Sequence, residues 1–412
     1  MGKVNIGIVR EGKIPVDRRA PLSPLQAQQV CFQYENVQIK CQESPVRCFT
    51  DEEYIEAGIP VVEELEDCDI LFGIKEVPIK ELIPNKTYFF FSHTIKQQAH
   101  NRKLLKAILD KKIKLVDYEC LTDLQGNRLI AFGRYAGIVG AYNGILAYGL
   151  KYNLFDLRRA RDCYDMADLK TEYSKVKLPK IKILVTGGGR VANGAIEVLD
   201  GMRIKRVSPQ ALLEEEFDQP VYAQLRSGDY HKRKTDGGFD AQEFYTAPHL
   251  YESTFLEYAQ KADMLIAAAF WQPNAPVLFT REDMQHKYFK IRVIADITCD
   301  IEGSIPSTKR PSTIDDPVYD YNPWEDKVAL PFSDRKFVSV MAVDNLPCEL
   351  PRNASKDFGH DIMKKILPLL LKEDKEKVIQ RATIAENGSL TPPYQYLQSY
   401  VDGTSSTNPD NR

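Results

Sequence analysis

A strand, a turn through three glycines and a helix follow one another in the middle of the chain. This succession constrains the fold more than any other feature. Residues 180–209 read KIKILVTGGGRVANGAIEVLDGMRIKRVSP. The run 181–186 is apolar and β-branched, as expected of a buried strand. Apolar residues then recur with helical spacing from Val191 to Met202. A strand that passes through a glycine turn into a helix is typical of a parallel β–α–β unit.

The glycine turn has the spacing of a dinucleotide-binding motif. Gly187, Gly189 and Ala192 match the first, third and sixth positions of G-x-G-x-x-G/A. The first glycine makes the tight turn, the second lets the backbone approach a pyrophosphate, and the helix N-terminus faces the anion. The alternative is a glycine-rich turn that binds nothing. We predict that the turn binds NAD or NADP. The residues expected to hold the cofactor there are Gly187, Gly188, Gly189, Arg190, Val191 and Ala192.

The carboxylate that normally accompanies this motif is missing. An Asp or Glu about 20 residues after the first glycine holds the adenosine ribose of NAD. Here that interval reaches Val207 and Ser208, and the next carboxylates begin at Glu214. Ser208 can hydrogen-bond a ribose hydroxyl but does not repel the 2′-phosphate of NADP, and Lys205 or Arg206 can attract it. The sequence therefore leaves the choice between NAD and NADP open.

Strand-like and helical segments alternate in both halves of the chain. Strands are expected at 4–8, 37–41, 69–75, 87–91, 113–118, 181–186, 203–207, 263–269, 291–296 and 337–343. Helices are expected at 24–32, 96–111, 134–150, 355–371 and 373–386, and a polar insertion or loop at 224–248. This alternation predicts an α/β protein with doubly wound, parallel sheets.

A length of 412 residues exceeds what one hydrophobic core usually supports. We predict two Rossmann-like domains with the active site in the cleft between them. Residues 1–150 would bind substrate and carry the catalytic groups, and 151–344 would bind the dinucleotide. The polar end, 402–412, has no apolar side chain to bury and is expected to be disordered.

Composition and charge disfavour several classes of partner. A formal net charge of −3 gives no reason to expect nucleic acid as a partner. The first residues are charged and unlike a signal peptide, and apolar runs such as KILPLLLK are too short to cross a bilayer. Eight cysteines lack metal-binding spacing, so no metal site is expected. We predict a soluble, cytoplasmic protein that acts on a small molecule. Its oligomeric state is not indicated.

Polar residues follow the expected strands of the first half, where ligands of open α/β sheets bind. Lys75 and Glu76 end one strand-like run, His93 follows the next, and Glu119 closes the third. Because parallel strands share one carboxyl edge, we expect these side chains to lie together. Each has a plainer alternative, such as a surface ion pair between Lys75 and Glu76 or a structural histidine.

Six segments resemble, in order, the lysine-forming saccharopine dehydrogenases and the lysine–ketoglutarate reductase part of the bifunctional enzymes of lysine breakdown. Alanine dehydrogenase is a more distant likeness. The segments are REGKIPVDRRAPLSP, ILFGIKEVP, FFFSHTIKQQ, VDYECLTDLQGNRLIAFGRYAG, IADITCDIEGSI and VDNLPCELPRNAS. The likeness extends from the N-terminus to about residue 370 and is weakest over 210–260.

The resemblance implies oxidation of the CH–NH bond of saccharopine by a nicotinamide cofactor, followed by hydrolysis to L-lysine and 2-oxoglutarate. Lys75 corresponds to the base that takes the proton of the amine, and His93 to the group that serves the hydrolytic steps. Glu76 and Glu119 correspond to neighbouring carboxylates. A lysine that acts as a base needs a pKa lowered by burial or by a nearby cation.

The resemblance also indicates how the substrate is held. Arg19 corresponds to an arginine of the family, and Lys96 and Arg128 are the next candidates for binding the carboxylates of the substrate. Asp300 corresponds to an aspartate near the nicotinamide and the substrate amine. Helices within 345–400 are implied to complete the first domain.

Three alternatives stay open. The same chemistry can run as an NADPH-dependent lysine–ketoglutarate reductase, which the missing carboxylate and the basic pair Lys205–Arg206 favour. An alanine dehydrogenase is a second alternative, against which the matches in FSHTIKQQ and DNLPCELP argue. A nucleotide sensor without catalysis is a third, and the presence of both Lys75 and His93 argues against it.

Overall fold

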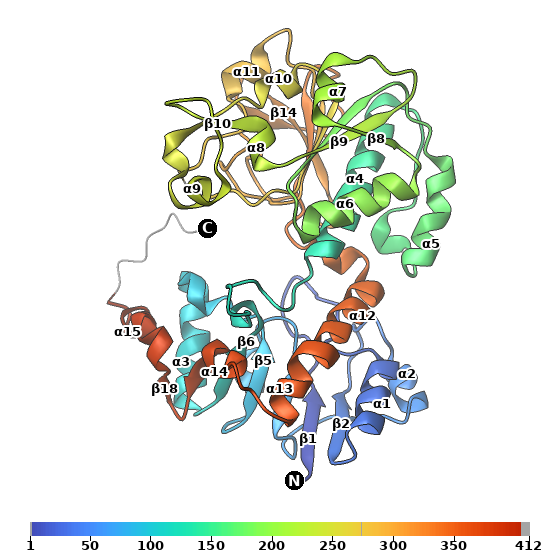
Figure 1. Cartoon of the computed structure of the whole chain (residues 1–412). Helices are drawn as coiled ribbons and strands as arrows, with labels where there is room; N and C mark the ends of the chain where they lie inside the picture. Colours follow the sequence, from blue (N-terminus) through green and yellow to red (C-terminus); the bar gives the residue numbers. More distant parts are fainter. Residues whose placement is uncertain (1, 273, 405–412) are drawn as a thin grey trace. The chain divides into compact units, whose positions relative to one another are not determined.

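The computed structural model describes residues 2–272 and 274–404, which fall into two compact units (Figure 1). Unit 1 comprises 1–132 and 351–412, and unit 2 comprises 133–350. The first boundary lies at 132, not at 150 as the sequence pattern predicts, because residues 133–152 form a helix that packs within unit 2. Of the tail expected to be disordered, Asp402 ends a helix and 405–412 lies outside the described residues.

Unit 1 contains an eight-stranded, mostly parallel sheet. In the order in which they pair, its strands are β18 (Ser389–Leu390), β17 (Thr383–Glu386), β6 (Lys114–Asp117), β5 (Thr87–Phe90), β4 (Ile70–Phe72), β1 (Val4–Ile8), β2 (Val37–Gln42) and β3 (Val61–Val62). Strands β1 to β6 are parallel, and β17 and β18 extend the sheet in antiparallel fashion. The parallel arrangement confirms the predicted fold class.

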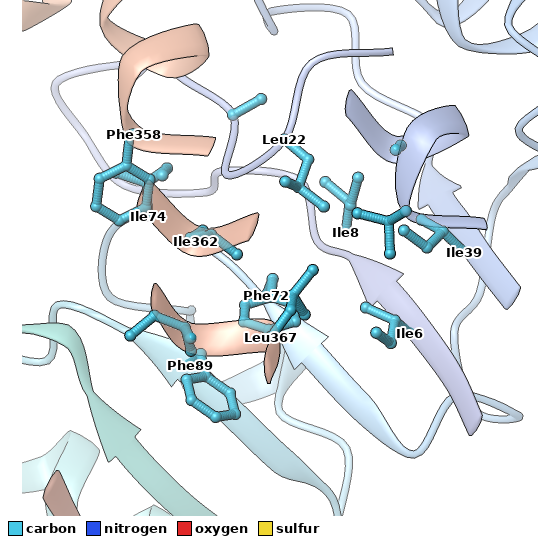
Figure 2. Packing of buried hydrophobic residues seen from close by; sticks show 14 of the residues in the cluster. Ile6, Ile8, Leu22, Ile39, Phe72, Ile74, Phe89, Phe358, Ile362 and Leu367 are labelled. Atoms are coloured by element: carbon cyan, nitrogen blue, oxygen red, sulfur yellow. The ribbon is translucent and has the colours of Figure 1, made fainter. Parts of the chain in front are cut away.

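Two apolar cores lie on opposite faces of this sheet, because neighbouring side chains of a strand point to opposite sides. Phe72, Phe89 and Phe358 belong to the core on one face, part of which is drawn in Figure 2. Leu71 and Tyr88 belong to the other core. The α-helices of unit 1 are α1 (Pro24–Gln33), α2 (Asp51–Glu56), α3 (Arg102–Asp110), α12 (Pro351–Asp361), α13 (Leu367–Leu371), α14 (Val378–Ala382) and α15 (Gln398–Asp402).

Unit 2 contains a second eight-stranded sheet. Its strands pair in the order β15 (Lys327–Ala329), β14 (Val318–Asn322), β16 (Val338–Met341), β13 (Val293–Asp296), β12 (Met264–Ala267), β7 (Lys182–Thr186), β9 (Val221–Leu225) and β8 (Lys205–Val207). All pairings are parallel except the two made by β14, which is antiparallel to both β15 and β16. A separate hairpin joins β10 (His231–Arg233) and β11 (Tyr251–Ser253). The α-helices are α4 (Gly133–Tyr152), α5 (Met166–Thr171), α6 (Arg190–Gly201), α7 (Pro209–Glu214), α8 (Ser227–Tyr230), α9 (Ala241–Thr246), α10 (Leu256–Ala259) and α11 (Arg281–Gln285).

Strand β9 lies between β7 and β8. This strand order differs from two expectations drawn from the sequence. The segment 224–248 is not simply a loop, because it contains the end of β9, α8, β10 and α9. Ser208 follows β8, which pairs with β9 and not with β7. Its hydroxyl caps α7 by accepting the N–H of Ala211 at 3.1 Å. Ser208 is therefore separated from the glycine turn by a whole strand.

Two expected helices are shorter than their patterns predict. Helix α3 begins at Arg102 and not at 96, because His93 and Gln97 have left-handed backbone conformations (φ 53° each) and interrupt the helical path. In 373–386 only α14 is helical, and Thr383 begins β17, whose pairing with β6 outweighs local helix propensity. No helix among the described residues is long and apolar enough to cross a membrane.

Helices α4 and α6 pack backbone against backbone at a glycine of each helix. A Cβ atom at Gly137 would overlap the carbonyl oxygen of Val191 and lie 2.8 Å from the nitrogen of Ala195. A Cβ atom at Gly194 would likewise overlap the carbonyl oxygen of Arg134. Because α6 begins at the glycine turn, this contact fixes the helix that follows the turn.

We predict that Gly137→Ala lowers the free energy of unfolding by about 1–3 kcal/mol, because overpacking outweighs the gain of about 1 kcal/mol in helix propensity. Urea unfolding followed by circular dichroism measures the shift. Gly189→Ala is the matched control, since no atom lies within 4 Å of the added Cβ. Equal unfolding midpoints for the two variants would contradict the close packing of α4 and α6.

Candidate active site

The carboxyl ends of four neighbouring strands of unit 1 carry the polar residues that the sequence singles out. Arg19 lies on the loop after β1, Lys75 and Glu76 follow β4, His93 follows β5, and Glu119 follows β6. The strands pair in the order β6–β5–β4–β1. The structure therefore brings these side chains to one edge of one sheet, where their charges interact.

Glu76 lies between a histidine and a lysine. Its Oε1 is 2.7 Å from Nδ1 of His93, and its Oε2 accepts a hydrogen bond from Nζ of Lys13 at 2.7 Å. Only 11% of the Glu76 side chain is exposed. Burial acts to raise the pKa of Glu76, but the hydrogen bond and charge of His93, together with Lys13, outweigh it and lower that pKa to about 2. Glu76 is thus ionised and orients the imidazole ring of His93.

Lys75 is partly buried at the same edge. Burial is the main cause that lowers the pKa of Lys75. The cations Arg19 and Lys13 lower this pKa further, whereas the carboxylates Asp17 and Glu76 oppose the shift. The net effect increases the neutral fraction of the amine, which is the form that can accept a proton.

Glu11 is a neighbour that the sequence patterns miss. Its two carboxyl oxygens accept the backbone N–H groups of Ile74 at 2.6 Å and Lys75 at 2.9 Å. Burial and the charge of Asp17 raise the pKa of Glu11 to about 8, against these hydrogen bonds and Arg19. Glu11 therefore fixes the backbone that carries Lys75. The segment REGKIP contains it, but only the pairing of β1 with β4 reveals the contact.

Arg19 is buried and already paired. Its Nε and Nη2 donate to Oδ1 and Oδ2 of Asp17 at 3.0 and 2.6 Å, and its guanidinium lies 4.1 Å from the centroid of the Phe132 ring. Only 3% of the residue is exposed. Arg19 thus contributes a fixed positive charge next to Lys75. Any substrate carboxylate would share this guanidinium with Asp17.

Glu119 connects two exposed cations. Its Oε1 accepts a hydrogen bond from Nη2 of Arg128, and Nζ of Lys96 lies 3.9 Å away. The other oxygen, Oε2, is buried and has no hydrogen-bond partner among the described residues. Asp117 holds this segment in place, since its Oδ1 accepts the N–H of Glu119 at 2.7 Å and its Oδ2 that of Ser92 at 2.9 Å. Lys96 and Arg128 are each about half exposed, as suits groups that bind a ligand from solution.

The glycine turn of unit 2 opens on a hollow of about 730 Å³, within the range of ~300–1,000 Å³ common for small-molecule sites. Gly187 has φ +98°, and a Cβ atom there would lie 2.9 Å from the carbonyl oxygen of Ala268. At Gly189 an added Cβ would meet open space. The N-terminus of α6 therefore faces room for an anion, and the turn fits a pyrophosphate. Gly188, Arg190 and Val191 also line the hollow, whereas Ala192 is fully buried.

Arg226 lies at the place in the sheet where the motif normally has its carboxylate, after the strand next to β7. Strand β9 pairs with β7 so that Leu225 lies opposite Thr186, which brings Arg226 level with Gly187. A Cβ atom at Gly188 would lie 3.8 Å from Nε of Arg226, and both residues line the hollow. Asp229 also lines it, but its Oδ2 accepts the backbone N–H of Arg226 at 2.6 Å. The residue at the end of the strand next to β7 is therefore cationic.

Asp300 follows β13 in unit 2. Burial, and then the charge of Asp296, raise the pKa of Asp300 to about 6. Asp296 itself is buried at the end of β13, where its Oδ2 accepts a hydrogen bond from Thr308 at 2.6 Å. Asp300 is thus a carboxylate of unit 2, whereas the other catalytic and substrate-binding residues of the sequence prediction lie in unit 1.

Models of known protein families match most of the chain. The N-terminal domain of the alanine dehydrogenase/PNT family matches residues 7–139, and the C-terminal domain of that family matches 167–393. A solved structure of L-alanine dehydrogenase superposes with a TM-score of 0.63 at 16% identity, over 98% of this chain and 100% of that one. This likeness confirms the fold with two Rossmann-like sheets.

Two groups of curated relatives are similar over most of the chain. The mitochondrial alpha-aminoadipic semialdehyde synthase of Mus musculus is 30% identical over 430 residues, which cover 93% of this chain and 46% of that protein. The NAD(+)-dependent, L-lysine-forming saccharopine dehydrogenase of Neurospora crassa is 25% identical over 349 residues, covering 80% of this chain and 82% of that protein. The chain thus spans about half the length of the semialdehyde synthases that it matches.

We predict that Glu76→Gln lowers the free energy of unfolding by about 3 kcal/mol at pH 5, the equivalent of the shift of the pKa from 4.5 to about 2. A carboxylate with a lowered pKa stabilises the fold fully above its unfolded pKa. The difference between wild type and variant should therefore shrink as the pH falls from about 4.5 toward 2. Urea unfolding at pH 5, 4 and 3 measures it.

The exposed Glu64 provides the matched control, because no ion pair involving it is seen among the described residues. Glu64→Gln should leave the free energy of unfolding within about 0.5 kcal/mol of wild type at each pH. A Glu76→Gln effect that is small, or independent of pH over this range, would contradict the ion pair.

Proposed function

The chain belongs to the alanine dehydrogenase/PNT family of oxidoreductases, and from this premise we propose that it interconverts saccharopine with L-lysine and 2-oxoglutarate. The proposed oxidation uses NADP or NAD and one water, and it is reversible. The observation that carries the proposal is the grouping of Lys75, Glu76 and His93 at one sheet edge, with Glu76 bonded to His93 and the pKa of Lys75 lowered. The similarity to the L-lysine-forming saccharopine dehydrogenase of Neurospora crassa supports the same chemistry.

Lys75 acts first in the oxidative direction. The neutral amine of Lys75 accepts the proton of the secondary amine of saccharopine while the α-carbon of the glutarate part loses a hydride. A bound nicotinamide supplies the acceptor for that hydride. Burial and the charges of Arg19 and Lys13 keep Lys75 available as a base. Glu11 supports this role by holding the Lys75 backbone.

His93 serves the hydrolysis that follows. Removal of hydride and proton leaves a C=N bond. His93 takes a proton from the water that adds to the carbon of this bond. His93 passes that proton to the nitrogen, which gives a carbinolamine. His93 then takes the proton of the carbinolamine hydroxyl and returns it to the nitrogen as the C–N bond breaks, which releases L-lysine and 2-oxoglutarate. Glu76 accepts a hydrogen bond from the other ring nitrogen and stabilises the imidazolium between these steps.

Three cations of unit 1 are proposed to bind the carboxylates of saccharopine. Lys96 and Arg128 present half-exposed charges, and Glu119 holds both near the same oxygen. Arg19 adds a buried charge that it shares with Asp17. Because planar guanidinium groups bind carboxylates in two-point fashion, Arg128 and Arg19 suit substrates with several carboxylates. Asp300 of unit 2 is proposed to face the substrate amine.

Arg226 favours NADP(H) as the cofactor. In sheets of this type a carboxylate after the strand next to the glycine strand selects NAD, whereas an arginine there accommodates the 2′-phosphate of NADP. Arg226 lies at that place beside Gly188. The cofactor is thus proposed to lie over the glycine turn with Arg226 at its ribose phosphate, which favours the NADPH-dependent reductase alternative.

We predict that Lys75→Met and His93→Gln each lower turnover by about 10²-fold or more, because each removes a proton carrier. Initial rates are measured by the absorbance of reduced nicotinamide, with saccharopine and NAD or NADP, and with L-lysine, 2-oxoglutarate and NADH or NADPH. Lys111→Met, which changes a lysine that donates to the backbone carbonyl of Leu82, is the matched control and should retain its rate. Unchanged rates in both active-site variants would contradict the assignment.

The same assay separates the alternative functions. Turnover with L-alanine or pyruvate and ammonia, without turnover of saccharopine, would identify an alanine dehydrogenase. Tight nucleotide binding without turnover of any substrate would identify a nucleotide sensor. Either result would overturn the proposed reaction.

We predict that Arg226→Asp lowers the ratio of kcat/KM for NADP to that for NAD by at least tenfold, because a carboxylate repels the 2′-phosphate and binds the ribose hydroxyls. The control is Ser208→Asp, whose carboxylate would lie beyond β9. That variant should keep the wild-type ratio. A shift in Ser208→Asp with no shift in Arg226→Asp would place the adenosine ribose at the end of β8.

A further inference from the structure

The segment between β9 and α10 has no part in the proposed reaction. We call residues 227–254 the inserted module; it contains α8, β10, α9 and β11. The module begins directly after Arg226 and returns to the sheet of unit 2 through α10 and β12. It therefore starts at the edge of the hollow over the glycine turn.

The inserted module has a small core of its own. The ring of His231 lies 4.5 Å from the rings of both Tyr230 and Phe244, and Phe244 lies 5.2 Å from Tyr251, measured between centroids. Burial lowers the pKa of His231 to about 4, so the ring packs as a neutral group. Phe239 contacts the same cluster at 5.6 Å from Phe244. These aromatic contacts connect α9 to the hairpin β10–β11.

Polar contacts hold α9 in one orientation. The Glu243 carboxylate accepts hydrogen bonds from Nε of Arg233 at 2.7 Å and from the hydroxyl of Tyr251. Asp240 caps the helix by accepting the N–H of Glu243 at 2.8 Å. The side chains of Glu243 and Phe244 contact other residues of the inserted module. The side chain of the next residue, Tyr245, lies on the part of α9 that the module leaves exposed. The position of Tyr245 is therefore fixed by its neighbours.

Tyr245 and two other aromatic residues line the hollow. Phe239 and Tyr245 come from the inserted module, and Phe270 comes from the segment after β12. Tyr245 is 57% exposed and Phe270 is 82% exposed. Large exposed rings at the rim of a cavity lose contact with water when a flat ligand covers them, which favours binding. The hollow thus combines the anion-binding glycine turn with exposed aromatic rings.

We propose that the inserted module forms the adenine-binding wall of the dinucleotide site and that Tyr245 stacks on the adenine ring. This inference rests on the proposed use of a nicotinamide dinucleotide. The glycine turn takes the pyrophosphate and Arg226 lies at the ribose 2′-position, so the next group on that side is the adenine. The module begins at Ser227 and lines the hollow on the same side. Its rings suit a purine, because stacking needs only a flat π-face.

Nucleotide fragments test this assignment without any need for turnover. Binding of 5′-AMP, 2′,5′-ADP and nicotinamide mononucleotide to the full chain is measured by calorimetry. Tyr245→Ala should lower the affinities for 5′-AMP and 2′,5′-ADP by the same factor, about tenfold, and leave the affinity for nicotinamide mononucleotide unchanged. Tyr245→Phe should restore wild-type affinity, because it keeps the ring. Tyr288→Ala removes a tyrosine of similar exposure (54%) elsewhere in unit 2 and should change none of the three affinities.

A matched comparison with Arg226→Ala separates the stacking of Tyr245 on adenine from the contact of Arg226 with the 2′-phosphate. That variant should lower the affinity for 2′,5′-ADP but not for 5′-AMP, because only the former carries the 2′-phosphate. Wild-type affinity of Tyr245→Ala for 5′-AMP would overturn the stacking role, as would a loss confined to nicotinamide mononucleotide. If the wild-type chain bound none of the fragments, both this inference and the proposed cofactor would fail. If 5′-AMP bound as predicted but saccharopine were not turned over, only the proposed reaction would fail.

Discussion

The hydrogen bond between Glu76 and His93 is the interaction on which the candidate active site depends. Glu76 is nearly buried, and it stays charged because His93 and Lys13 each neutralise one of its oxygens. A charged carboxylate so close to Lys75 would by itself raise the pKa of the lysine. The positive charges of Arg19 and Lys13 oppose this effect, so that burial prevails and the pKa of Lys75 is lowered. The sheet edge thus holds the ionised Glu76 next to Lys75, whose pKa is lowered.

In unit 2 the corresponding constraint is the position of one strand. Strand β9 is inserted between β7 and β8, and its register places Arg226 level with the glycine turn. The same insertion starts the module that lines the hollow with Phe239 and Tyr245. This strand order therefore puts a guanidinium where a carboxylate commonly follows the strand next to the glycine strand, and it brings two aromatic side chains to the same hollow.

The sequence predicts those features that depend on periodicity and on the ends of parallel strands. Lys75, His93 and Glu119 could be grouped in advance because each follows an apolar strand. Glu11 could not, since its contact with the N–H of Lys75 depends on which strand lies next to β1. Arg226 was missed because it lies about twice as far along the chain as the ~20-residue interval of the motif allows. Local sequence patterns do not specify the order of strands in a sheet, because long-range packing decides it.

The most direct test of the central claim follows the hydride itself. Saccharopine that carries deuterium on the α-carbon of its glutarate part is incubated with the protein and NADP or NAD, and the reduced nicotinamide is examined by mass spectrometry. The account predicts that the deuterium is transferred to the cofactor while unlabelled L-lysine and 2-oxoglutarate are released. Deuterium that appeared in water, or reduced cofactor that carried none, would contradict it.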